Sequence, residues 1–170
     1  MNLLKKIMPS RKEQRVVEIT KEQVDREMTS WIHDMQKKVP RVSKAVFFNS
    51  DNEDDLLINL KPIYNRLGGK PSKDFYMSRI TFDIFEEDEK DLALLLDSMQ
   101  VIVEDYFIKR GTLPIKPESE ENEIEYPYLI GTGLLKDTPD TPLYIEEFEY
   151  GVFFVTLKPQ KQKVLKINKT

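Results

Sequence analysis

An apolar repeat between residues 88 and 110 constrains the fold of this chain more than any other feature. Side chains suited to one helix face recur at steps of four, three, four, three and four: Leu92, Leu96, Met99, Val103, Tyr106 and Arg110. Three more widen this stripe on its flanks: Leu95, Ile102 and Phe107. The spacing predicts a long amphipathic helix that starts near Asp88 and packs against a core. Gly111 should close this helix, and Pro114 prevents its extension.

A second helix is predicted over residues 21–38. Thr20 and Gln23 have the spacing of a capping box. Apolar side chains follow at steps of three and four residues: Val24, Met28, Trp31, Ile32 and Met35. Pro40 should end this helix.

Three shorter helical segments are also expected. In the segment 60–67, Pro62 suits a first turn, and Gly68 suits the left-handed residue that follows a helix. The segment 78–88 is predicted to form a brief helix capped by Ser78. The stretch "YPYLIGTGLL", which begins at Tyr126, should add another helical turn.

The remaining patterns predict strands. Residues 42–48 are β-branched and aromatic, and 75–78 is a short extended segment. Residues 143–157 predict an antiparallel hairpin with Gly151 at its turn. Since 152–157 is apolar on both faces, we expect this strand to be central or covered by helices. The predicted fold class is α+β: a single domain with two main helices packed on a small, mostly antiparallel sheet that ends in a C-terminal β-hairpin.

Charge divides the chain into an acidic body and two basic tails. The chain has 170 residues, which suits one domain, expected over 16–157. This body holds 16 Lys and Arg against 29 Asp and Glu, a net charge of −13. The N-terminal tail, 1–15, carries +4, and the C-terminal tail, 158–170, carries +5. The tails could contact nucleic acid or an anionic membrane, be disordered ends that aid solubility, or fold back on the acidic body.

Composition excludes several classes of site. The chain has no cysteine, which removes disulfides, thiolate metal sites and cysteine nucleophiles. No apolar run approaches the roughly 18 residues of a membrane span. The stretch "MNLLKKIMPS" has no apolar core of the kind a secretory signal needs. We therefore expect a cytoplasmic, bacterial protein.

Three loops resemble ligand-binding motifs but fail at required positions. A calcium loop that begins at Asp51 would need Gly at Leu56 and Glu at Pro62. The stretch "GGKPS" has Pro71 where a phosphate loop needs Ser or Thr. The stretch "GTG" has Lys136 where a dinucleotide motif needs its third glycine. Hence no cofactor and no metal ligand are predicted.

The residues that could act in catalysis also have simpler structural explanations. His33 is the only histidine, and no nucleophile elbow accompanies it, so we interpret it as an ordinary helix residue. The acidic run Glu86–Asp91 has the carboxylates that a hydrolase could use. The same acids complement a helix N-terminus, with Asp88 as the cap and Asp91 three residues on. We assign no catalytic residue and keep the hydrolase as an alternative.

Aromatic side chains give the best candidate contact surface. Four of them fall within eleven residues: Phe75, Tyr76, Phe82 and Phe85. Such residues are most often core, but they also anchor interfaces. The hydroxyl of Tyr76 favours a solvated edge. They are therefore predicted to line a possible interaction groove.

The stretch "LGGKPSKDFYMSRITFDIFEEDEK" resembles the core motif of a small family of bacterial proteins. The residues that carry the resemblance are Leu67, Gly68, Gly69, Pro71, Phe75, Tyr76, Met77, Ser78, Thr81, Phe82, Ile84, Phe85, Glu86 and Glu87. That family is a domain of unknown function from spore-forming, low-GC Gram-positive bacteria. The resemblance implies a cytoplasmic α+β domain without assigned activity, and it carries over no functional residue.

The functional hypothesis that follows is a non-catalytic protein–protein interaction module with an unknown protein partner. One alternative is a peripheral membrane or nucleic-acid-associated protein that acts through its basic tails. The other alternative is the carboxylate-dependent hydrolase. An enzyme is the less favoured class, because each catalytic or cofactor motif fails at a required position.

Overall fold

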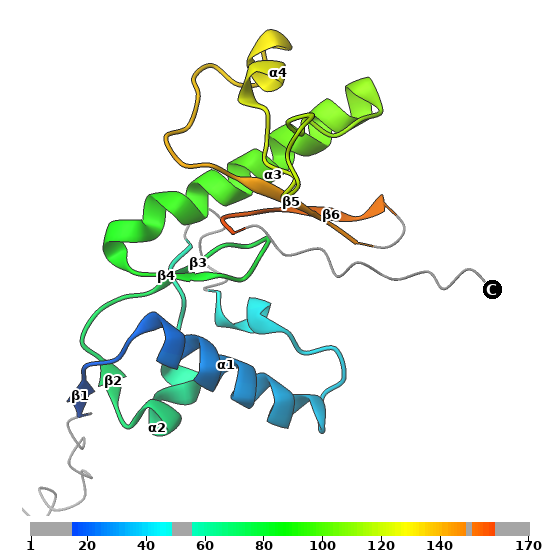
Figure 1. Ribbon diagram of the computed structural model, residues 1–170. Coiled ribbons are helices and arrows are strands. Elements are labelled where there is room, and N and C mark those ends of the chain that lie inside the picture. The colour runs from blue at the N-terminus through cyan, green and yellow to red at the C-terminus, as the bar shows by residue number, and fades with distance from the viewer. Residues whose placement is uncertain (1–14, 49–55, 149–150, 159–170) are drawn as a thin grey trace, which may run out of the picture.

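The computed structural model describes residues 15–48, 56–148 and 151–158 (Figure 1). Its two main helices are α1 (Lys21–Gln36) and α3 (Lys90–Arg110), as predicted. The capping box at the start of α1 is confirmed. The Gln23 amide donates to Thr20 Oγ1 at 3.3 Å, and the Thr20 amide donates to Gln23 Oε1 at 2.8 Å.

The long helix α3 ends at Gly111, whose φ of 72° is left-handed, as expected. Its start differs from the prediction. A 3-10 turn, η3 (Glu87–Glu89), precedes it, and the capping box joins Glu86 to Glu89 rather than Asp88 to Asp91. The Glu86 amide donates to Glu89 Oε2 at 3.3 Å. Several acids in a row offer alternative caps, and the two glutamates at the right spacing are the ones used.

Two of the three predicted shorter helical segments are present. A 3-10 turn, η2 (Lys61–Ile63), leads into α2 (Tyr64–Leu67), and α4 (Tyr126–Gly131) follows later in the chain. The predicted strand over 42–48 is wrong, because Lys44–Phe47 forms a 3-10 turn, η1. Ser43 caps this turn, and the turn places the buried Phe47 ring against Trp31, with ring centroids 5.3 Å apart.

Within the described residues, the strands form three two-stranded ladders. Strand β1 (Val16–Val17) pairs in parallel with β2 (Lys70–Pro71). Strand β3 (Tyr76–Met77) pairs antiparallel with β4 (Ile84–Phe85). Strands β5 (Tyr144–Glu147) and β6 (Phe153–Thr156) form the expected C-terminal hairpin. The α+β fold class is thus confirmed.

The predicted helix over 78–88 is wrong. Residues 78–83 form the turn between β3 and β4, 84–85 are β4 itself, and η3 begins at Glu87. The Ser78 hydroxyl oxygen accepts hydrogen bonds from the amides of Ile80 at 3.2 Å and Thr81 at 3.0 Å. Ser78 therefore caps a turn instead of a helix. Asp97 of α3 accepts a hydrogen bond from the Ser78 hydroxyl at 2.6 Å and fixes the turn against that helix.

Two hydrophobic clusters lie on opposite sides of the β3–β4 ladder. The α1 cluster is built around Val24, Met28, Phe47, Leu60 and Ile63. The α3 cluster is built around Leu96, Met99, Val103, Ile124, Leu129, Leu143 and Val155. In Figure 1, β3 and β4 lie between α1 below and α3 above. Residues alternate along a strand, so this ladder contributes side chains to both clusters.

Helix α3 covers the C-terminal hairpin through a buried glutamine. The Val155 amide donates to Gln100 Oε1 at 2.8 Å, and Gln100 Nε2 donates to the Phe153 carbonyl at 3.1 Å. Gln100 thereby satisfies the edge of β6 that does not pair with β5. This arrangement leaves the opposite side of α3 free of the hairpin.

Candidate functional site

The four aromatic residues of the predicted groove do not lie on one surface. Phe75 is 1% exposed and Phe85 is 3% exposed, so both belong to the core. Tyr76 and Phe82 are half-buried. Phe75 and Phe82 pack with the α1 cluster, whereas Tyr76 and Phe85 pack with the α3 cluster. The dense aromatic signal thus comes from a layer covered on both faces, and only Tyr76 and Phe82 keep part of their surface exposed.

The exposed edge of Tyr76 contacts side chains at the start of α3. Its hydroxyl donates a short hydrogen bond to the Glu87 carboxylate. The ammonium of Lys90 lies 5.8 Å from the Tyr76 ring centroid and 3.1 Å from Glu87 Oε1. The hydrogen bond from Tyr76, with help from Lys90, lowers the pKa of Glu87. These contacts fix Tyr76 as part of the β3–α3 junction.

Ion pairs likewise hold the acidic residues that precede α3. Lys73 Nζ lies 2.7 Å from Glu86 Oε2, and Lys21 Nζ lies 2.6 Å from Glu89 Oε1. The hydrogen bond with Glu86 raises the pKa of Lys73, and the one with Lys21 lowers the pKa of Glu89. Both lysines are distant in sequence, so sequence reasoning could not pair them. The arrangement assigns these acids to capping and ion pairs and adds no support to a hydrolase.

The other motif candidates also have structural roles or lie outside the description. The acids at 51–55 lie outside the described residues, as do both basic tails apart from Arg15 and Lys158. His33 is an exposed residue of α1. Within the described ranges, no three His, Asp or Glu side chains are grouped so as to hold a metal ion. None of the helices in this part of the chain is long and apolar enough to cross a membrane.

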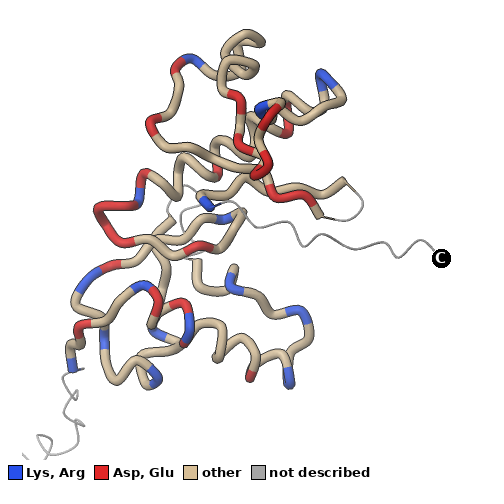
Figure 2. Tube along the Cα trace, viewed as in Figure 1, with Lys and Arg blue, Asp and Glu red and all other residues tan. Residues whose placement is uncertain are grey.

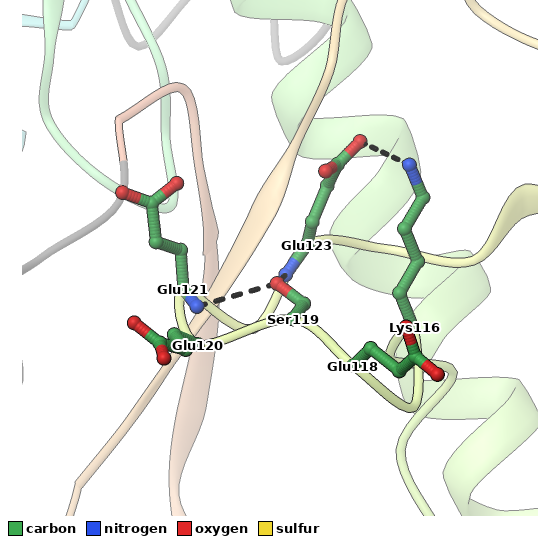
Figure 3. A pocket seen from close by; sticks show the side chains of 6 residues that line it. All are labelled: Lys116, Glu118, Ser119, Glu120, Glu121 and Glu123. Carbon is green, nitrogen blue, oxygen red and sulfur yellow. Dashed lines mark hydrogen bonds and ion pairs between the residues drawn. The ribbon is translucent and has the colours of Figure 1, made fainter.

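An acidic hollow of about 410 Å³ lies in the connector before α4 (Figure 3). Its lining consists of Lys116, Glu118, Ser119, Glu120, Glu121 and Glu123. Lys116 Nζ pairs with Glu123 Oε1 at 2.5 Å, and the Ser119 hydroxyl accepts from the Glu123 amide at 2.9 Å. Figure 3 shows the carboxylates of Glu118, Glu120 and Glu121 pointing apart. The hollow is therefore a turn held by local hydrogen bonds, with no converging ligand set.

A second hollow of about 370 Å³ lies between the end of α3 and α4. The side chains around it combine a cation, aromatic rings and small polar groups: Tyr106, Arg110, Thr112, Pro127, Tyr128, Gly131 and Thr132. Arg110 is the only charged residue among them. One cation beside neutral groups defines no particular ligand.

A different surface, the outer face of α3, has a regular pattern. Leu94 is 46% exposed, Val101 is 57% exposed and Ile108 is 79% exposed. They stand seven residues apart, about two helical turns, and so share one face. Leu94 and the buried Leu96 lie about 200° apart around the helix. We call Leu94, Val101 and Ile108 the outer stripe of α3, since they point away from the core.

Sequence reasoning missed the outer stripe because it assigned the apolar residues of α3 to the inward seam. The signal was present: Leu94, Val101 and Ile108 repeat every seven residues, but they are out of register with the seam through Leu96 and Val103. A helix that is apolar on two opposite sides is typical of one covered on both sides.

Acidic residues flank the outer stripe. Asp91, Glu104 and Asp105 are exposed on the same helix. Within the described ranges, none of the three has a lysine or arginine at ion-pair distance. By contrast, Asp25 and Asp34 on α1 are both paired with cations. The outer face of α3 thus combines uncovered apolar groups with three carboxylates that have no ion pair within the described residues, and one exposed lysine, Lys109, lies beside them near the end of the helix.

The comparisons with known proteins identify the family. Residues 14–154 match a family described as "Protein of unknown function (DUF3939)". The chain belongs to this family. The comparisons with curated proteins and with solved structures give no match.

The DUF3939 match covers both main helices, the outer stripe of α3, the α1 cluster and the α3 cluster up to residue 154, just before Val155. It leaves out most of both basic tails. A domain of unknown function of this kind was expected from the motif at 67–90. The expected origin in spore-forming bacteria stays a prediction, since the family description states no organism.

Proposed function

We propose that this DUF3939 chain is a non-catalytic protein–protein interaction module whose contact surface is the outer stripe of α3. The observation that carries the proposal is the regular exposure of Leu94, Val101 and Ile108 opposite the buried seam. Single exposed apolar residues are normal on a protein surface. A heptad-spaced row on one helix face is instead typical of a surface that receives another helix.

The stripe replaces the aromatic groove as the favoured contact surface. Phe75 and Phe85 would have to leave the core to touch a partner, which would expose large apolar side chains in both clusters. The stripe needs no such rearrangement. Full burial of an exposed side chain of this kind contributes about 1.5–3 kcal/mol before the costs of association. Each stripe residue would contribute less than this, because part of its surface is already covered.

Two valines with similar exposure provide a matched test. Val101 is 57% exposed on the stripe, and Val46 is 48% exposed on η1. The intact protein, Val101→Glu and Val46→Glu would each be used to capture proteins from a lysate of the source organism, with mass spectrometry as readout. We expect one set of partners with the intact protein and Val46→Glu, and its loss with Val101→Glu. Equal capture by all three proteins would contradict the proposal.

A second proposal concerns the basic tails, which favour contact with anionic membranes or nucleic acid through their charges of +4 and +5. Co-sedimentation with anionic liposomes, and a gel-shift assay with DNA, would be measured at low and at high salt. The proposal requires binding at low salt that high salt removes. Absence of binding to both probes at low salt would exclude it.

A further inference from the structure

We infer that the partner that covers the outer stripe of α3 is a basic amphipathic helix. This inference rests on the proposed function and adds the chemistry of the partner. It is carried by the spacing of the stripe and by the charge that surrounds it.

The spacing favours a helix. Leu94 and Ile108 are 14 positions apart on α3, about 21 Å at 1.5 Å per residue. A second helix with its own apolar side chains every three to four residues can place them between those of the stripe along this length. Each anchor of the stripe then contacts side chains from two turns of the partner.

The flanking residues favour positive charge on that helix. Asp91 and Asp105 lie on one side of the stripe, and Glu104 lies on the other. All three are exposed and, within the described residues, lack a cation at ion-pair distance. Glu104 Oε1 accepts a hydrogen bond from Gln100 Nε2 at 2.7 Å, on the side of Glu104 that faces the hairpin. Lysine or arginine beside the apolar seam of the partner would complement these carboxylates, as flanking charges do in coiled coils.

The whole C-terminal half of the chain reinforces this preference. Residues 83–158 hold six Lys and Arg against 19 Asp and Glu, a net charge of −13, while residues 15–82 hold 12 against ten. Figure 2 shows Asp and Glu along α3 and the connector before α4, whereas most Lys and Arg lie nearer α1 and α2. A field of this sign attracts a basic partner to the α3 side of the molecule.

The same charges disfavour a second copy of this chain as the partner. In an antiparallel pair centred on Val101, Leu94 would face Ile108 of the other copy. The geometry would also place the Glu104 side chains of both copies on the same side of the interface. Like charges across an interface cost binding energy. A basic helix meets the same stripe without this repulsion.

The test uses the full chain and two synthetic amphipathic helices with the same leucine seam. One peptide has lysine beside the seam, the other has glutamate, and binding is followed by fluorescence anisotropy. We expect the basic peptide to bind at least about tenfold more tightly than the acidic one, with the difference reduced at about 0.5 M salt. Val101→Glu should weaken binding of the basic peptide by about tenfold or more.

A pair of double variants distinguishes the effect of charges beside the stripe from the effect of the net charge of the chain. The double substitution Glu104→Lys and Asp105→Lys should reverse the preference toward the acidic peptide. The control Glu120→Lys and Glu121→Lys makes the same change of net charge in the acidic hollow, away from the stripe. We expect this control to change the affinity for the basic peptide by less than about twofold, because salt screens charges that lie far from the stripe.

Three results would overturn the inference. The first is no binding of the basic peptide, or equal weakening by both double variants. The second is a dimer in analytical ultracentrifugation that Val101→Glu dissociates; the partner would then be a second copy, and the proposed interaction module would stand. The third is binding of the basic peptide to a variant with Lys161, Lys163 and Lys166 changed to Glu, but not to the unchanged chain. That result would identify the chain's own C-terminal tail as the occupant of the stripe. The lysate experiment with Val46→Glu tests the proposed function separately.

Discussion

Gly69 lies where β2 passes against the backbone of β1. A Cβ atom at this position would come within 2.1 Å of the Arg15 carbonyl oxygen, which accepts a hydrogen bond from the Lys70 amide at 2.8 Å. We therefore expect Gly69→Ala to separate β1 from β2 and to lower the free energy of unfolding by about 1–3 kcal/mol. Urea unfolding gives the energy, and hydrogen exchange at the Lys70 and Ser72 amides reports the lost pairing.

Gly131 provides the matched control for this substitution. It ends α4, and a Cβ atom there would have no heavy atom within 4 Å. Gly131→Ala should leave stability unchanged or slightly raise it, because alanine favours a helix. An equal loss of stability in both variants would contradict the close-contact explanation for Gly69.

Gln100 joins α3 to the C-terminal hairpin through two hydrogen bonds. It is 2% exposed and satisfies both the Val155 amide and the Phe153 carbonyl. Gln100→Leu would leave these buried groups without their partner, so we expect a loss of about 1–3 kcal/mol. Urea unfolding and hydrogen exchange at the Val155 amide measure this loss. Ser98→Leu, an exposed change on the same helix, should have little effect; unchanged protection of Val155 in Gln100→Leu would exclude the proposed link.

At the scale of elements, an ion pair joins α1 to α2. Arg66 Nη2 lies 2.7 Å from Asp34 Oδ2, and hydrogen bonds from Arg66 and then Lys37 lower the pKa of Asp34 from 3.8 to about 2. A lowered pKa means that the pair stabilises the folded protein above pH 3.8 and that this contribution disappears as the pH falls toward 2.

Arg66→Gln should therefore raise the pKa of Asp34 toward 3.8. The variant should also have a flatter dependence of stability on pH between 4 and 2. Carboxylate titration by NMR measures the first effect, and urea unfolding at several pH values measures the second. Lys37→Gln, which removes the second cause of the shift, should raise the pKa less. A titration of Asp34 that is unchanged in Arg66→Gln would contradict the pairing.

The elements that sequence predicted are those with strong local signals. The Thr20 capping box, the periodic seam of α3 and Gly111 define their helices without help from the rest of the chain. The segment 42–48 was missed because its composition suits a strand, while the contact between Phe47 and Trp31 selects a 3-10 turn. Only the folded chain contains that contact.

The candidate site was less predictable for a related reason. A short aromatic segment can line a groove or form a layer, and the difference depends on whether both faces are covered. Phe75 and Phe85 became core because α1 and α3 pack on opposite sides of the β3–β4 ladder. The outer stripe was visible as a seven-residue repeat, but its exposure depends on which side of α3 the hairpin covers. These facts belong to the tertiary structure.

At the scale of the whole molecule, the β3–β4 ladder makes the two clusters interdependent. Met77 and Ile84 are buried in the α1 cluster, and Phe85 is buried in the α3 cluster. The Ser78 turn between these strands is also bonded to Asp97 of α3. Neither cluster can lose its packing without exposing one face of the shared ladder, so the molecule should unfold in one cooperative transition.

Leu96→Ala tests this cooperativity, because Leu96 lies in the α3 cluster while Trp31, the only tryptophan, packs with the α1 cluster. Loss of the buried leucine should cost about 2–5 kcal/mol. We expect the urea midpoint from Trp31 fluorescence to fall together with the midpoint from far-ultraviolet circular dichroism. Leu94→Ala, the same substitution on the exposed side of α3, should move neither midpoint by much. If Leu96→Ala lowers the circular dichroism midpoint while Trp31 unfolds as before, the two clusters are independent units, and the β3–β4 ladder does not couple them.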